Sequence, residues 1–230
     1  MKIGGFQKTS LLDYPDTISA IVWTVGCNFN CPFCYNVDLV KGNVNLISEE
    51  EILGFLGKRK GLLEGLVITG GEPFLQKDLK SFCKKVKKIG YLIKIDTNGT
   101  FPDKLQELVD NKLVDYVAMD VKAPKEKYTD LSGVKTDISK INKSIKIIQD
   151  KASDYEFRTT IIPDLLDKED IVEIAHWLKG SKRFYLQQFK NDTPLISSKL
   201  LKKKLYDGVF LKETLNEIKP YFDECSIRGD

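Results

Sequence analysis

Two compact runs of apolar and β-branched residues, at 20–25 and 66–69, are followed along the chain by four further strand-like stretches. Continuous apolar runs of this length are typical of strands that are buried on both faces of a sheet. The sequence therefore predicts six buried strands, at residues 20–25, 66–69, 91–95, 114–119, 155–162 and 184–189.

Segments with the apolar spacing of helices lie between these predicted strands. Two helical faces are formed by Leu79, Phe82, Cys83 and Val86, and by Ile138, Ile141, Ile145 and Ile148. Ser48 followed by Glu51 predicts a capping box and hence the start of a helix. Strands that alternate with helices need crossover connections, which gives a parallel sheet with helices outside. About six such units fit, fewer than the eight of a closed TIM barrel. We therefore expect an α/β fold, a partial (β/α)6-type TIM barrel, in a single domain over residues 1–230.

The tail from Asn191 is less regular. It holds a lysine run at 202–204, a predicted helix at 212–221 and a strand-like stretch at 225–227. The lysine run is either a solvated helix face or a docking surface for an acidic partner.

Composition and charge argue against two classes of partner, nucleic acids and membranes. The 36 basic and 33 acidic residues nearly balance and are spread along the chain, so we expect no nucleic-acid partner. No apolar run approaches the roughly 20 residues of a membrane helix, and the N-terminus lacks the apolar core of a signal peptide. We expect a cytoplasmic protein with no membrane partner.

Five cysteines favour metal or redox chemistry over a disulfide framework in such a compartment. Cys27, Cys31 and Cys34 lie together directly after the first predicted strand, whereas Cys83 and Cys225 stand alone and are expected as small core residues. Thiolates favour Zn or Fe-S centres, which usually take four protein ligands in structural sites. A 4Fe-4S cluster held by three cysteines would leave one iron open to a small ligand.

A structural zinc site remains an alternative reading. It would need a distant fourth ligand, such as Cys225 or His176. Structural zinc sites usually present paired cysteines at two places in a fold, so the Fe-S reading is favoured. His176, the one histidine of the chain, is otherwise expected to be structural, which leaves little for acid/base or Ser-His-Asp catalysis.

The spacing C27-x3-C31-x2-C34, with Phe33 before the last cysteine, resembles the signature of the radical S-adenosylmethionine (SAM) superfamily. Residues 69–73, Thr-Gly-Gly-Glu-Pro, resemble the GGEP motif of that family. Two glycines allow close approach of the backbone to a ligand, and the Glu72 carboxylate could accept hydrogen bonds from the ammonium of methionine.

Further motifs at the ends of later strands resemble those of glycyl-radical enzyme activating enzymes. They are Asp96-Thr97-Asn98-Gly99, Asp120-Val121-Lys122 and Arg158. Polar groups at successive strand ends converge on one mouth of a barrel. The resemblance implies that the cluster is held by Cys27, Cys31 and Cys34, and that the cofactor cleft is lined by Phe33, Tyr35, Gly70, Gly71, Glu72, Asp96, Asn98, Asp120, Lys122 and Arg158.

Residues 5–15 and 227–229 resemble the ends of the activating proteins of anaerobic ribonucleoside-triphosphate reductase. The chain departs from many activating enzymes at Tyr35, where they have His, and at Asp16, where they have Gly. No cysteine lies between Cys34 and Glu72, so a single 4Fe-4S cluster is expected.

The resemblance implies an oxidoreductase that reductively cleaves S-adenosylmethionine to a 5′-deoxyadenosyl radical, which then abstracts hydrogen from a glycine of a partner such as anaerobic ribonucleotide reductase. It also implies a reducing partner such as ferredoxin or flavodoxin. A radical SAM enzyme that acts on a small molecule, similar to the carboxy-deazaguanine synthases, is the first alternative. A non-enzymatic zinc or Fe-S binding module is the second.

Overall fold

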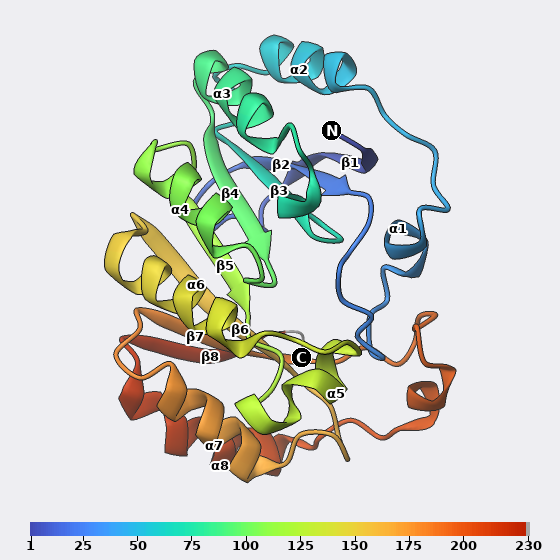
Figure 1. Cartoon of the computed structure of the whole chain (residues 1–230), viewed down its shortest axis with the longest axis vertical. Helices are drawn as coiled ribbons and strands as arrows, with labels where there is room; N and C mark the ends of the chain where they lie inside the picture. The colour runs from blue at the N-terminus through green and yellow to red at the C-terminus, as the bar shows by residue number, and fades with distance from the viewer. Residues whose placement is uncertain (229–230) are drawn as a thin grey trace.

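A computed structural model describes residues 1–228, so Gly229, part of the C-terminal resemblance, lies outside the described residues. One eight-stranded sheet runs in sequence order, with β1 antiparallel to β2 and all later neighbours parallel (Figure 1). The strands are β1 (Ile3–Ser10), β2 (Ser19–Thr24), β3 (Gly65–Gly70), β4 (Leu92–Thr97), β5 (Tyr116–Asp120), β6 (Asp154–Ile161), β7 (Arg183–Gln188) and β8 (Glu224–Arg228).

The six predicted strands form β2 to β7, and the strand-like stretch at 225–227 forms β8. Strand β1 was not predicted, because its centre carries glycines and exposed polar residues rather than an apolar run. It lies at the edge of the sheet, where one partner strand is enough and polar side chains face water.

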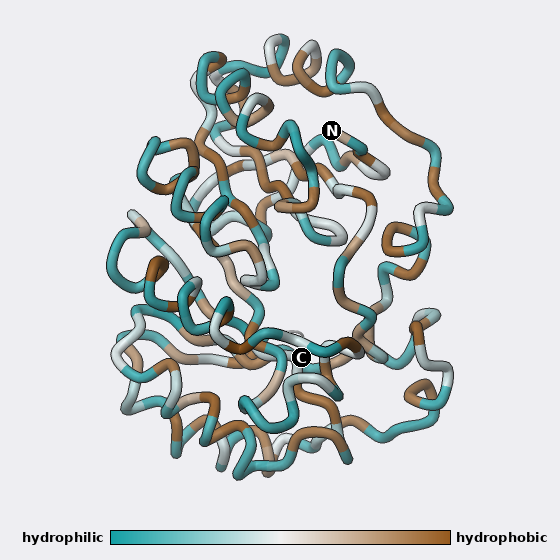
Figure 2. Tube along the Cα trace, in the orientation of Figure 1, coloured by the Kyte–Doolittle hydropathy of each residue, from teal (hydrophilic) through white to brown (hydrophobic). Residues whose placement is uncertain are grey.

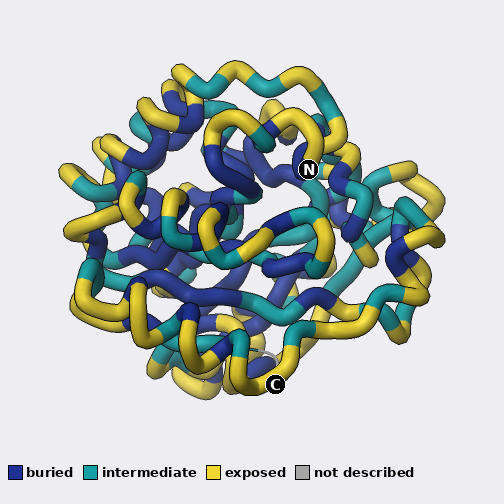
Figure 3. Tube along the Cα trace, turned by 90° about the horizontal axis from the view of Figure 1, so that it is seen from below, coloured by how far each residue is buried: buried dark blue, intermediate teal, exposed yellow. Residues whose placement is uncertain are grey.

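Helices cover the outside of the curved sheet, as predicted, and the periphery is exposed while the strands are buried (Figures 1 and 3). The Ser48 side chain accepts a hydrogen bond from the Glu51 backbone N–H at 3.1 Å, which caps the second helix at the predicted start. The helices are α1 (Val37–Lys41), α2 (Glu49–Lys58), α3 (Leu79–Ile89), α4 (Pro102–Asp110), α5 (Tyr128–Ser132), α6 (Ile138–Lys151), α7 (Lys168–Trp177) and α8 (Gly208–Ile218), with short 3-10 turns at Pro73–Leu75, Lys125–Lys127, Ser198–Lys202 and Lys219–Tyr221.

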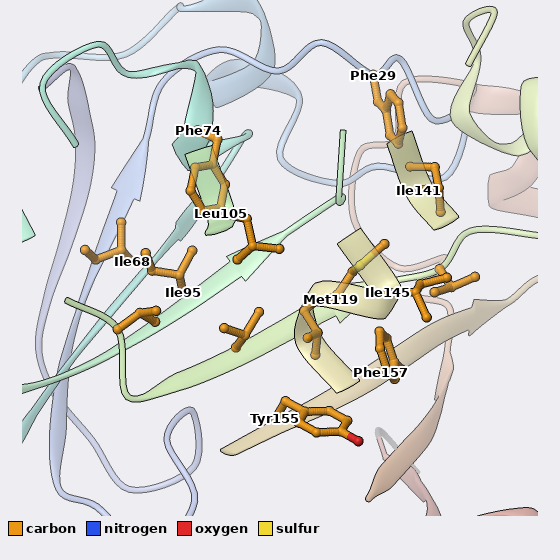
Figure 4. Packing of buried hydrophobic residues seen from close by; sticks show 14 of the residues in the cluster. Phe29, Ile68, Phe74, Ile95, Leu105, Met119, Ile141, Ile145, Tyr155 and Phe157 are labelled. Atoms are coloured by element: carbon orange, nitrogen blue, oxygen red, sulfur yellow. The ribbon is translucent and has the colours of Figure 1, made fainter. Parts of the chain in front are cut away.

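The two faces of the sheet carry different clusters of side chains, because successive residues of a strand point to opposite sides. Outward side chains such as Ile68, Ile95, Met119 and Phe157 pack against the helices in the main core (Figure 4). Helix surfaces alternate between hydrophobic and hydrophilic residues accordingly (Figure 2). The inward face has a separate small apolar cluster of Tyr14, Ile21, Val67, Tyr116 and Ala118.

The barrel is incomplete. Within residues 1–228, β1 pairs with β2 and β8 pairs with β7, and no ladder joins β1 to β8. The two edge strands, β1 and β8, therefore leave the sheet unclosed between them. The same range contains no helix with the length and apolarity needed to cross a membrane.

Candidate active site

A cavity of about 630 Å³ lies at the carboxyl ends of the parallel strands and is also lined by residues of both edge strands, Gly4 and Gly5 of β1 and Arg228 of β8. Its volume is in the range of small-molecule sites. Twelve of the predicted site residues line it: Cys27, Cys31, Phe33, Cys34, Tyr35, Gly70, Gly71, Asp96, Asn98, Asp120, Lys122 and Arg158. Side chains that the sequence spreads over more than 130 positions are thus brought to one wall.

The cysteine loop, residues 27–34, follows β2 directly. A turn closes it, with the Cys34 N–H donating to the Cys31 carbonyl at 3.0 Å. The Cys27 sulfur accepts from the Phe29 N–H at 3.4 Å. Burial raises the pKa of Cys27 to about 11 and of Cys31 to about 12, so these thiols are protonated at neutral pH in the free protein. Metal binding at this loop must therefore release protons.

Two other parts of the chain hold the cysteine loop in place. The Asn98 side-chain amide donates to the Asn28 side-chain oxygen at 2.9 Å, and the Asn28 amide donates to the Thr100 hydroxyl at 2.9 Å. The Asn30 N–H donates to the Ser132 carbonyl at 2.8 Å. The loop is thereby tied to the turn after β4 and to the end of α5, which fixes the position of its sulfurs relative to the strand ends.

The glycine pair after β3 is required by the neighbouring backbone. The Gly71 N–H donates to the Thr24 carbonyl and the Glu72 N–H to the Gly26 carbonyl, both at 2.9 Å. A Cβ on Gly71 would lie 1.9 Å from the Gly26 carbonyl oxygen, and Gly70 has a φ of +113°. Only glycine fits both positions without strain. The pair therefore lets the β3 turn pack against the start of the cysteine loop, while both glycines also face the cavity.

Glu72 does not line the cavity, unlike the other predicted site residues. Its side chain is fully buried, and its carboxylate accepts hydrogen bonds from the Phe74 N–H, the Thr97 hydroxyl and the Asn98 N–H at 3.1, 2.9 and 2.8 Å. Burial raises its pKa to about 7, against the effect of these donors. The expected role, accepting from a ligand ammonium, is not supported by this placement. Glu72 instead joins the β3 and β4 turns behind the cavity wall.

Five charged side chains on β4, on β6 and at the end of β5 form a connected array, and all of them except Lys94 line the cavity. Arg158 donates to Asp120 at 2.8 Å and to Asp96 at 3.3 Å, Lys122 donates to Asp120 at 3.0 Å, and Lys94 donates to Asp96 at 2.7 Å. Burial disfavours ionisation of both aspartates, but the neighbouring cations outweigh it. Arg158 and Lys122 hold the pKa of Asp120 well below its usual range, and Arg158 and Lys94 lower that of Asp96. Both aspartates are therefore ionised at neutral pH.

An extension of this array was missed in the sequence: Glu156, whose carboxylate lies 3.6 Å from the Arg158 guanidinium. The Glu156 carboxylate is completely buried and accepts from the Arg228 guanidinium at 3.0 and 3.1 Å and from the Tyr116 hydroxyl at 2.8 Å. Arg228 lines the cavity at the open side of the barrel. The available signal was the two-residue spacing of Glu156 from Arg158, which places both on the inward face of β6.

The three cysteine thiols of the loop fit an Fe-S cluster better than a single zinc ion. Three soft thiols lie on one loop, which suits Fe-S chemistry. Within residues 1–228, no group of three or more His, Cys, Asp or Glu side chains is arranged around one metal ion. Cys225 is buried in the core, and His176 contacts Tyr221 at 3.4 Å, so neither proposed fourth zinc ligand lines the cavity. Cys83 is likewise a fully buried core residue.

Comparisons with known proteins agree with this site. The family model described as the radical SAM superfamily matches residues 21–178. A Methanocaldococcus jannaschii protein, provisionally named a glycyl-radical enzyme activating enzyme, is 38% identical over 98% of this chain and 95% of its own. A 7-carboxy-7-deazaguanine synthase from Methanospirillum hungatei is 28% identical over 64% of this chain and 59% of its own.

Among solved structures, Streptococcus suis SuiB bound to S-adenosylmethionine superposes with a TM-score of 0.70 over 90% of this chain and 49% of its own, at 17% identity, which shows the shared fold alone. The family match covers well over half of the chain and includes the cysteine loop. The chain belongs to the radical SAM superfamily and is a radical SAM enzyme, with a 4Fe-4S cluster and S-adenosylmethionine as cofactors.

Proposed function

We propose that this enzyme installs a glycyl radical on a partner polypeptide and acts as a single domain over residues 1–230. One observation carries the proposal: the cavity that contains the cysteine loop is also lined by Gly4 and Gly5 of β1 and by Arg228 of β8, the two edge strands that no ladder joins within residues 1–228. A polypeptide loop can approach a site bordered by unjoined edge strands, whereas a small substrate is better bound in an enclosing pocket. The match to an activating enzyme over nearly the whole chain supports the same function.

The chain's residues have separable roles in this proposal. Cys27, Cys31 and Cys34 would hold the 4Fe-4S cluster with one thiolate each, and S-adenosylmethionine would bind where the chain supplies no fourth ligand. When bound, the reduced cluster supplies the electron that cleaves S-adenosylmethionine to a 5′-deoxyadenosyl radical. The Lys122 ammonium is suited to the methionine carboxylate, and the Asp120 carboxylate to hydroxyl or ammonium donors.

The remaining residues of the cavity wall orient the binding side chains and shield the cavity from water. Phe33 is buried with the Lys122 ammonium 5.8 Å from its ring centroid, which fixes the lysine above the cysteine loop. Asn98 holds Asn28 of that loop, and Arg158 fixes Asp96 and Asp120. The backbone of Gly70 and Gly71 and the side chain of Tyr35 complete the cofactor wall. Walls that exclude water protect a reactive radical from side reactions.

The partner is a glycyl-radical enzyme, such as an anaerobic ribonucleotide reductase, and the reducing equivalent comes from a carrier such as ferredoxin or flavodoxin. We place these reactions in the cytoplasm, without nucleic-acid or membrane partners. The synthase relative aligns with a smaller part of the chain, which gives the small-molecule alternative weaker support.

Anaerobic reconstitution tests the proposal. The reduced enzyme should show a 4Fe-4S signal in electron paramagnetic resonance and form 5′-deoxyadenosine, and Cys31→Ala should abolish both. Addition of a glycyl-radical enzyme from the same organism should produce an organic radical signal on that partner. A normal cluster and normal 5′-deoxyadenosine with no radical on any such partner would overturn the activating function but leave the radical SAM chemistry intact.

A further inference from the structure

The segment from Lys190 to Lys204, named here the basic segment, carries five lysines and one aspartate. It follows β7 and includes the 3-10 turn Ser198–Lys202. In Figure 1 it is the orange stretch at the lower right, beside the blue cysteine loop. The 36 basic and 33 acidic residues of the chain nearly balance, so this is a local concentration of positive charge.

The basic segment is attached directly to the cysteine loop. The Ile196 N–H donates to the carbonyl of Cys34 at 3.0 Å, and the Ser197 N–H donates to the carbonyl of Pro32 at 2.8 Å. Two adjacent residues of the segment thus bond to the stretch that contains the last cysteine. Any protein that binds the segment is brought close to the cluster.

The segment is held as an ordered structure by its apolar side. Leu195 and Leu200 are buried in the main core. The Asn191 side chain donates to the Lys203 carbonyl at 2.8 Å, and the Lys203 ammonium pairs with Asp164. Lys203 is therefore engaged in an ion pair within the chain. The neighbouring lysines point toward solvent.

Four lysines of the segment are free for a partner. Lys190, Lys199, Lys202 and Lys204 are exposed, and no ion pair to them is found within residues 1–228. Apolar side chains are exposed in the same region: Leu201 is 36% exposed, Leu205 43% and Tyr35, next to Cys34, 57%. A mixture of cations and a few apolar groups is typical of the small interfaces of transient redox complexes.

We propose that the basic segment, together with Tyr35, is the docking surface for an acidic one-electron carrier protein. The inference rests on the proposed function only in requiring that the cluster is reduced by a protein. In each encounter the carrier loses one electron and the cluster gains one, which is then consumed in S-adenosylmethionine cleavage. Electron transfer falls steeply with distance, so the carrier must dock close to the cysteine loop, and complementary charge accelerates such encounters.

Charge reversal with a matched control tests binding without turnover. Lys202→Glu/Lys204→Glu is compared with Lys84→Glu/Lys88→Glu, which makes the same charge change on exposed lysines of α3, at the opposite end of the molecule (Figure 1). The probe is flavodoxin, and its dissociation constant is measured at low and high salt. The segment variant should bind about tenfold more weakly and lose part of the salt dependence. The α3 variant should bind as the wild type does.

Two reductants then separate docking from chemistry. With dithionite, which needs no docking, both variants should form 5′-deoxyadenosine at the wild-type rate. With reduced flavodoxin, the segment variant alone should be slower. Equal flavodoxin affinity and equal flavodoxin-driven rates in all three proteins would overturn the docking proposal, whereas absence of product with dithionite in the wild type would overturn the enzyme function itself.

A third measurement identifies a competing occupant. Radical formation on the glycyl-radical enzyme is driven by dithionite in wild type and variants. If the segment variant loses this transfer but binds flavodoxin normally, the surface belongs to the polypeptide substrate and the carrier proposal is wrong. Lys199→Glu, on the same segment and outside the cavity lining, repeats all three measurements at an independent site, so that an effect of one variant on folding does not decide the result.

Discussion

Glu156 and Arg228, separated by 72 positions, form a two-bond ion pair inside the barrel, with nitrogen to oxygen distances of 3.0 and 3.1 Å. The pair joins the centre of β6 to the last described residue of β8. A bidentate guanidinium–carboxylate pair adds geometric specificity to its energy. It therefore fixes the final strand at the side of the barrel that β1 leaves open.

Glu156→Gln should destabilise the fold. The amide replaces one carboxylate oxygen with an NH2 donor, which cannot accept from the second Arg228 N–H, and an unsatisfied buried donor costs about 1 to 3 kcal/mol. Urea unfolding of the cluster-free protein measures the loss. Glu224→Gln is the control, because Glu224 pairs with Arg183 at a more exposed site and such pairs contribute little. Equal stability of both variants would contradict the role given to Glu156.

Gly71→Ala should disturb the cysteine loop. The added Cβ would lie 1.9 Å from the Gly26 carbonyl oxygen, so the loop or the β3 turn must move. We expect a destabilisation of about 1 to 3 kcal/mol, typical of overpacking, and reduced iron content after reconstitution. Gly57→Ala in α2 has no atom within 4 Å of its new Cβ and should be neutral or stabilising. Thermal unfolding and iron per chain measure both variants.

Cysteine substitutions should divide into two classes. Alanine at Cys27, Cys31 or Cys34 should sharply reduce bound iron after anaerobic reconstitution, because each thiolate is expected to hold one iron. Cys83→Ala should keep its iron and lose only some stability, since Cys83 is a fully buried core residue on α3. Iron and sulfide analysis checks this, and loss of iron in the Cys83 variant would refute the assignment.

Stability should depend on pH through Glu72. Burial raises its pKa from 4.5 to about 7, so folding takes up a proton between these values and the free energy of unfolding should fall as pH rises through this window. Stability from this group is fully present below the lower pKa and lost above the higher one. Glu72→Gln cannot titrate and should lack this part of the slope. Parallel unfolding profiles of the two cluster-free proteins would show that folding does not raise the pKa of Glu72.

The sequence was sufficient for the parallel strands and most of the cavity wall. Strands β2 and β3 are compact apolar runs, the later strands keep apolar and β-branched residues at alternate positions, and the polar residues that follow several of them had to meet at one end of the sheet. Strand β1 could not be recognised because pairing at an edge does not need apolar side chains, and Gly4 and Gly5 weaken the strand pattern further.

The environment of the Glu72 carboxylate also could not be predicted from the sequence. A motif places the residue in a turn, but whether its carboxylate faces a ligand or a neighbouring turn depends on the backbone of β4, where Thr97 and Asn98 donate to it. Likewise, the inward position of Glu156 follows from strand alternation, but its partner Arg228 is determined only when β8 joins the sheet.

The attachment of the cysteine loop has a consequence for biosynthesis. Its first supports, Asn98, Thr100 and Ser132, lie in the first 60% of the chain, but the bonds from Ile196 and Ser197 come much later. During translation, the cysteine loop is synthesised long before Ile196 and Ser197, whose N–H groups hydrogen-bond to it. On a nascent chain the cysteine loop would lack these two hydrogen bonds, so its sulfurs would not yet be held in their final positions. Cluster insertion is therefore best suited to the finished polypeptide.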